Sequence, residues 1–156
     1  MSRRVLRVLV PLIAVLLSVS LVGSASATTL IDIVDAVLVE DGAAVQVTVA
    51  VTCDPLGADS QAFLGVNVGQ GTHIQPYLFI EGFASYGEIG GASLICDGTP
   101  HTYSLTVRPT AAFADKKFRP GPATVEAWVT VCTAVAPGTY QCEQTARSLE
   151  RFILGS

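Results

Sequence analysis

The sequence predicts an all-β protein, a sandwich of two antiparallel sheets with seven or eight strands and two disulfides. Three observations lead to this fold class. Apolar and polar residues alternate with a period of two along several segments, whereas helical periodicity is almost absent. Clusters of Gly, Pro and Asp separate these segments, as is typical of the turns between short strands. The four cysteines form an even set, which in an oxidising compartment predicts two disulfides.

The first 27 residues are expected to be a cleaved secretory signal peptide. Three arginines precede an apolar run, Val8–Val22, and small residues follow it up to Ala27. The run is short for a membrane span, so an uncleaved anchor is the less favoured alternative. We therefore expect residues 28–156 to form a single secreted β-sandwich domain without membrane attachment.

Composition argues against several function classes. The chain has a net charge of −4, and removal of residues 1–27 with their three arginines lowers it to −7. Such a domain, without a basic cluster, is a poor partner for nucleic acid because phosphate contacts need Lys and Arg. Half of the residues are hydrophobic and 14% are charged, so the chain is also unlike a disordered tail.

The first half of the exported domain predicts four strands. Asp41-Gly42 is a hairpin signal between the first two strands, and alternate valines share one face of the second. Pro76 and Gly82 interrupt the fourth strand, because proline lacks an amide donor and glycine weakens a strand. The four expected strands are Ile33–Glu40, Ala44–Cys53, Gln61–Gln70 and Gln75–Ala84.

The second half predicts one short strand and three longer ones. Turn residues at Asp97–Pro100 and Arg119–Pro122 separate them. Alternation is clean in the middle two strands, which place Tyr103, Leu105 and several valines on inward faces. The expected strands are Ser93–Cys96, His101–Val107, Ala123–Val131 and roughly Thr145–Leu154.

The strand faces favour one disulfide pairing among three. Cys53 and Cys96 fall on inward faces, so a bridge between them would cross the interior. Cys132 is in phase with the outward residues of its strand, so Cys132–Cys142 would pin an exposed loop from outside. A zinc site is the weaker alternative, because the cysteines have no C-x-x-C spacing and no nearby histidine.

Several segments of the chain suggest a known group of proteins. Cys96–Val107 reads CDGTPHTYSLTV and Phe118–Val125 reads FRPGPATV; a cysteine pair follows, and a valine-rich strand ends at Cys53. Together they resemble a small secreted domain common in high-GC Gram-positive bacteria. That group is similar in layout to immunoglobulin-like β-sandwiches and, more loosely, to the neocarzinostatin type of apoprotein. The resemblance covers most of the exported chain and implies a fold and secretion from the cell rather than an activity.

The residues offer no clear catalytic or metal-binding pattern. No serine lies in a G-x-S-x-G motif, and the two histidines, His73 and His101, are isolated in the sequence. Acidic residues lie at turns or on separate strands, and no run has the spacing of a calcium loop. We therefore expect a protein that is not an enzyme and uses no cofactor or metal.

Four aromatic residues lie within ten positions and allow two interpretations. Tyr77, Phe79, Phe83 and Tyr86 could cap the core, because aromatic side chains dominate core burial. The neocarzinostatin resemblance implies instead an open cleft in which they line a site for a small apolar molecule.

Trp128 and the segment between Cys132 and Cys142 are the other candidate contacts. Trp128 is in phase with the outward residues Glu126 and Thr130, where an indole is either covered by a loop or presented to a partner. The segment contains Pro137 and Tyr140 and is braced by its disulfide, which lowers the entropic cost of binding. It is either a simple hairpin tip or the loop of a secreted protease inhibitor.

These expectations converge on a secreted, monomeric, non-catalytic binding module. Its partner would be an unknown protein or glycan, contacted through Trp128 and the segment between the last two cysteines. The alternatives are a carrier of a small apolar ligand, with the aromatic cluster as its site, and a protease inhibitor. The sequence leaves the choice open.

Overall fold

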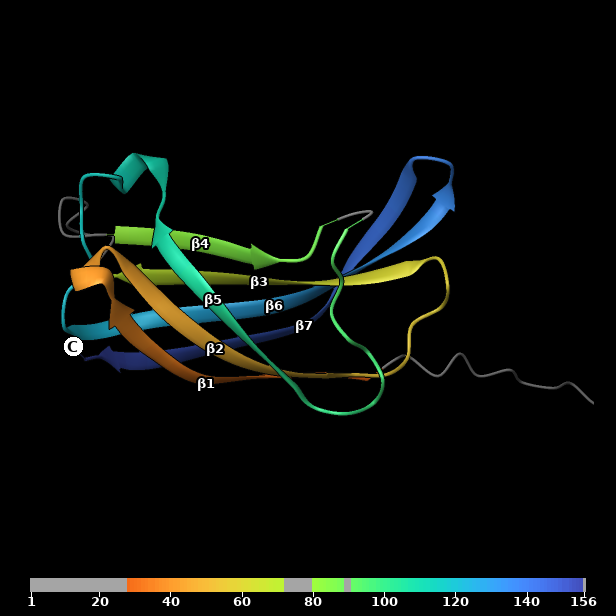
Figure 1. Ribbon diagram of the computed structural model, residues 1–156, viewed down its shortest axis with the longest axis horizontal. Helices are drawn as coiled ribbons and strands as arrows, with labels where there is room; N and C mark the ends of the chain where they lie inside the picture. Colours follow the sequence, from red (N-terminus) through yellow and green to blue (C-terminus); the bar gives the residue numbers. More distant parts are fainter. Residues whose placement is uncertain (1–27, 72–79, 89–90, 156) are drawn as a thin grey trace, which may run out of the picture.

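The computed structural model describes residues 28–71, 80–88 and 91–155, which fold into seven antiparallel strands (Figure 1). No α-helix occurs in this part of the chain, and two short 3₁₀ turns follow β1 and β5. The predicted signal peptide, Tyr77 and Phe79 lie outside the described residues. The strands are β1 (Thr29–Val39), β2 (Ala44–Cys53), β3 (Ser60–Gln70), β4 (Ile80–Tyr86), β5 (His101–Pro109), β6 (Gly121–Ala136) and β7 (Thr139–Leu154).

The strands form two layers that are joined into one nearly closed sheet. Their order is β1-β2-β5-β4-β3-β6-β7, with three strands in the first layer and four in the second. Placing the first, second and fifth strands opposite the third, sixth and seventh is the arrangement of an immunoglobulin-like sandwich. The predicted fold class is therefore confirmed, with the refinement that a β4–β5 contact links the layers.

The link between the layers depends on a glycine. β4 pairs with β5 through two residue pairs only, Gly82 with Pro109 and Phe83 with Arg108. A Cβ atom at Gly82 would lie 2.6 Å from the carbonyl oxygen of Arg108, so no other residue allows this approach without a shift. At the other end of the strand order, the Leu38 N–H donates to the Gly155 carbonyl oxygen at 3.3 Å.

The core is built from the inward faces that alternation predicted. The valines of β2 are buried, as are the alternating apolar residues of β3, β5 and β6 that face them. These β-branched side chains suit a pleated, half-buried surface. Members of this cluster include Val45, Val47, Val49, Val51, Leu64, Val66, Val68, Leu105, Val107, Val125, Ala127 and Val129.

One predicted strand is absent: Ser93–Cys96 belongs to an irregular segment between β4 and β5. The segment satisfies its backbone groups elsewhere. The Leu94 N–H donates to the carbonyl oxygen of Ala62 at 2.9 Å, and the Ile95 N–H donates to the Tyr103 hydroxyl oxygen at 2.8 Å. Leu94 is buried, so the segment covers one end of the core without extending a sheet.

Both predicted disulfides are present, Cys53–Cys96 and Cys132–Cys142. Cys53 is buried, as its strand face predicted. Cys132 keeps the outward phase that the sequence predicted, because the register of β6 with β3 runs unbroken from Trp128 to Cys132, yet its side chain is only 4% exposed. In register it lies between Gln61 of β3 and Cys142 of β7, so the neighbouring strand and its own bridge cover it.

The segment between the last two cysteines is a hairpin arm rather than an open loop. β6 continues to Ala136 and β7 begins at Thr139, so only Pro137 and Gly138 form the turn. Gly138 has a φ of 73°, a left-handed conformation that favours glycine. The arm extends beyond the main body of the sheet at the upper right of Figure 1. This outcome matches the simple hairpin interpretation.

The two disulfides are expected to differ in their effect on stability. Cys53–Cys96 closes a sequence separation of 43 residues and Cys132–Cys142 one of 10. On the loop-entropy account, replacing both members by alanine costs about 4 kcal/mol for the first bridge and about 3 kcal/mol for the second. Urea unfolding of the two double variants checks this order. A larger loss for the arm bridge would contradict it.

Candidate binding face around Trp128

The outer surface of β4-β3-β6-β7 carries aromatic, acidic, basic and amide side chains close together. Strand register aligns them in three rows across the four strands, and we call these rows the Trp128 face. Successive rows lie about 6.8 Å apart, because each strand residue rises about 3.4 Å and alternate residues share a face. In strand order the rows are Ser85-Gly65-Trp128-Arg147, Phe83-Asn67-Glu126-Leu149 and Glu81-Gly69-Thr124-Arg151.

An aromatic pair occupies one end of this face. The rings of Phe83 and Trp128 are stacked, with centroids 5.8 Å apart and planes inclined by 25°. The indole lies directly over Gly65, where a Cβ atom would come within 2.4 Å of a ring carbon. Trp128 is half-buried by this packing, and Phe83 remains 51% exposed. An aromatic pair of this kind contributes about 0.5–1.5 kcal/mol beyond its area burial.

A polar groove of about 260 Å³ lies beside the aromatic pair, between β4 and β7. Asn67 on β3 donates from its amide nitrogen to Glu81 Oε1 at 2.8 Å. Its amide oxygen is buried and has no hydrogen-bond partner among the described residues. A buried acceptor without a partner costs about 1–3 kcal/mol, so this atom is an unsatisfied polar group on a residue that lines the groove. The groove is lined by Asn67, Gly69, Gly71, Glu81, Thr124, Glu126 and Leu149.

The charges of the face balance one another. Arg147 Nε lies 2.6 Å from Glu126 Oε1, and both side chains are accessible enough for solvent to weaken the ion pair. Arg151 lies opposite Thr124, in the row that also contains Glu81. The three rows therefore hold two carboxylates and two guanidinium groups, interleaved with an amide and hydroxyl groups.

The structure separates the remaining candidate residues. Phe83 and Tyr86 lie on opposite faces of β4. Phe83 contacts Trp128 on the outer face, whereas Tyr86 packs against Tyr103 with ring centroids 4.9 Å apart. Burial raises the pKa of the Tyr103 hydroxyl. Pro137 and Tyr140 lie on the hairpin arm, and Tyr140 is exposed there. Phe83 is not part of the core, and neither role of Tyr77 or Phe79 is decided by the described residues.

A second group of polar residues surrounds His101, at the turn before β5. Asp97 Oδ1 accepts from Thr99 Oγ1 at 2.6 Å and from the Thr99 N–H at 2.9 Å, and it lies 3.0 Å from His101 Nε2. Thr99 and Asp97 both meet the same imidazole nitrogen, whereas a catalytic triad needs the two ring nitrogens to contact different partners. These contacts are those of a turn.

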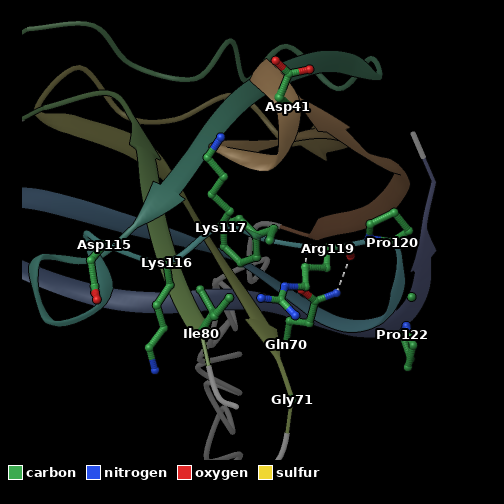
Figure 2. Close-up of a pocket in the computed structure, with 12 residues that line it drawn as sticks. Asp41, Gln70, Gly71, Ile80, Asp115, Lys116, Lys117, Arg119, Pro120 and Pro122 are labelled. Carbon is green, nitrogen blue, oxygen red and sulfur yellow. Dashed lines mark hydrogen bonds between the residues drawn. The ribbon is translucent and has the colours of Figure 1, made fainter. Parts of the chain in front are cut away.

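A larger hollow of about 770 Å³ lies where the segment before β6 meets the end of β3. Figure 2 shows Gln70 reaching the Arg119 backbone: its amide oxygen accepts from the Arg119 N–H, and its amide nitrogen donates to the Arg119 carbonyl. Lys116 and Lys117 also line the hollow. Gly71 at the end of β3 and Ile80 at the start of β4 complete its described lining.

Comparisons with known proteins do not assign the chain to a family. No protein-family model matches the sequence, and neither curated proteins nor solved structures return a significant match. Among the residues that the structure describes, no group of three His, Cys, Asp or Glu side chains could hold a metal ion. In the same residues, no helix is long and apolar enough to cross a membrane.

Sequence reasoning identified Trp128 and Phe83 separately and missed the groove beside them. Asn67, Glu81 and Glu126 come from three different strands, so only strand pairing brings them together. One sequence signal was available. Gly65, Asn67 and Gly69 occupy alternate positions of β3, a pattern that indicates a face with little side-chain volume.

Gly65→Ala is expected to displace the indole of Trp128. The new methyl group would overlap the ring, and such overpacking costs about 1–3 kcal/mol. Trp128 is the single tryptophan of the chain, so a change in its fluorescence emission reports the displacement directly. Gly57→Ala is the matched control, because its Cβ atom would meet only one atom, at 3.9 Å. Unchanged emission in the Gly65 variant would refute the close packing.

Asp97 is expected to titrate well below an ordinary aspartate. Hydrogen bonds from the Thr99 hydroxyl, the Thr99 N–H and His101 lower the pKa of this carboxyl from 3.8 to about 2. Because the folded pKa is the lower one, the contribution to stability is present above pH 4 and is lost as the pH falls toward 2. Carboxyl-carbon NMR measures the pKa. In parallel, Asp97→Asn should remove part of the stability loss over that interval.

Proposed function

We propose that the protein is a secreted, non-catalytic binding module that contacts its partner through the Trp128 face. The observation behind this proposal is the stack of exposed Phe83 on half-buried Trp128, beside a groove lined by Asn67, whose buried amide oxygen has no partner in the described part of the chain. Aromatic anchors next to a few convergent polar groups are typical of binding sites. Export is supported by the signal-like pattern of residues 1–27 and by two disulfides, which persist in oxidising compartments.

The packing of the sandwich supports a site on its outer surface. The interior is filled by valine, alanine and leucine side chains from both layers. Phe83 and Tyr86 lie on different sides of β4, so these two residues do not line a common cleft for a carried molecule. The arm of Pro137 and Tyr140 is a paired hairpin whose turn consists of Pro137 and Gly138 alone. The outer face is therefore the better-supported site.

The proposal predicts that the purified exported protein sediments with isolated cell envelopes of the organism that produces it. Phe83→Ala and Trp128→Ala should each lower the affinity for envelopes about 5- to 30-fold, because aromatic side chains that the partner covers contribute the most to such contacts. The bound fraction is read by gel after centrifugation at several protein concentrations.

Ile95→Ala is the matched control for these variants. Ile95 is 54% exposed, close to the 51% of Phe83, and lies on the irregular segment away from the Trp128 face. It should bind as the wild type does. Tyr140→Ala tests the hairpin arm separately. Retained binding by the Phe83 and Trp128 variants, with loss in the Tyr140 variant, would move the contact to the arm and overturn the proposal.

A further inference from the structure

We propose that the Trp128 face binds a neutral polysaccharide, an inference that rests on the proposed binding function of the same face. A sugar ring has apolar sides made of C–H groups and a rim of hydroxyl groups. A protein surface that matches it needs an exposed aromatic ring directly beside polar side chains. The first two rows of the Trp128 face place both within about 6.8 Å, the spacing of alternate residues on a strand.

The aromatic pair is suited to the apolar side of a sugar ring. The indole of Trp128 packs against the backbone of Gly65 in the space that a side chain would fill, so this contact positions the ring before any ligand arrives. Phe83 extends the apolar surface toward β4 and is half-exposed. A ring that is already positioned loses little freedom on binding, which favours affinity.

The groove is suited to the hydroxyl rim of a neighbouring sugar unit. A hydroxyl group both donates and accepts hydrogen bonds, and the groove offers partners of both kinds. Glu81, Glu126 and Thr124 present acceptor oxygens, and the guanidinium of Arg147 is adjacent. Asn67 lines the same groove, and its amide oxygen has no hydrogen-bond partner among the described residues; a ligand hydroxyl that reaches this oxygen exchanges the bond between Asn67 and Glu81 for new ones.

The charges of the face select a neutral polymer over other classes of partner. Two carboxylates and two guanidinium groups leave the three rows without net charge. A basic peptide would need surplus carboxylates, and an anionic polymer would need surplus arginines. An apolar peptide would bury the groove and take its two carboxylates and Arg147 out of water without supplying new hydrogen bonds. The aromatic pair spans the first two rows and the groove the second and third, so together they suit two units of a chain rather than one free sugar.

The experiment is native electrophoresis of the exported protein in gels that contain glycogen, xylan, galactomannan or laminarin. We expect at least one of these neutral polysaccharides to retard the wild type, and pectate, an anionic polymer, to have no effect. Phe83→Ala and Trp128→Phe should weaken the retardation at least tenfold, while Ile95→Ala should migrate as the wild type does. Titration with oligosaccharides of the retarding polymer should change the emission of Trp128, the single tryptophan. Circular dichroism verifies that each variant is folded.

Treated cell envelopes separate failure of this inference from failure of the binding function. Periodate cleaves the vicinal diols of 1→4-linked polymers such as glycogen, xylan and galactomannan, so it should abolish sedimentation with envelopes unless laminarin is the retarding polymer, whereas protease treatment should leave sedimentation intact. If protease abolishes sedimentation and Phe83→Ala also does, the partner is a protein: the polysaccharide inference is overturned and the binding face stands. If Phe83→Ala and Trp128→Phe sediment normally, both proposals are overturned. No retardation by any of the four polymers, together with periodate-resistant sedimentation, overturns the polysaccharide inference alone.

Discussion

Burial of short branched side chains between two layers is the constraint on which the rest of this fold depends. The alternate valines of β2 meet the inward residues of β3 and β6, and this cluster is almost completely withdrawn from water. Burying one such side chain contributes about 1.5–3 kcal/mol, so the summed term is the main source of stability. Because valine and alanine are small, the two layers must lie close together. Cys53–Cys96 ties the second strand to the segment that covers one end of this core.

Two glycines allow close contacts that a side chain would block. Gly82 lets β4 reach β5, which joins the two layers into one nearly closed sheet. Gly65 lets the indole of Trp128 lie against β3 on the opposite surface of the second layer. In the sequence Gly82 interrupts a strand pattern, whereas Gly65 lies within a predicted strand. Their physical role is to remove a side chain where backbone or an aromatic ring must pass.

The candidate site is a consequence of the same architecture. Since the valine core takes up the inward face of β4-β3-β6-β7, the outward face is free to display polar and aromatic side chains. Register sets which of them meet: Phe83 lies opposite Asn67, and Asn67 lies opposite Glu126. The rigidity of a paired sheet holds these groups in place, which is the property that a binding surface needs.

The sequence by itself determined the all-β class, the inward faces of the strands and both disulfides. It also placed the ends of β2 and β3 to within one residue. These follow from local alternation, because side chains on a strand point to opposite sides with a period of two. Tertiary structure alone decided that Ser93–Cys96 is irregular, that Cys132 is covered, and that the last two cysteines close a paired arm. It also decided the Trp128 face, since strand order and the register of β3 with β6, whose partners lie 53 to 73 positions apart, leave no local signal in the chain.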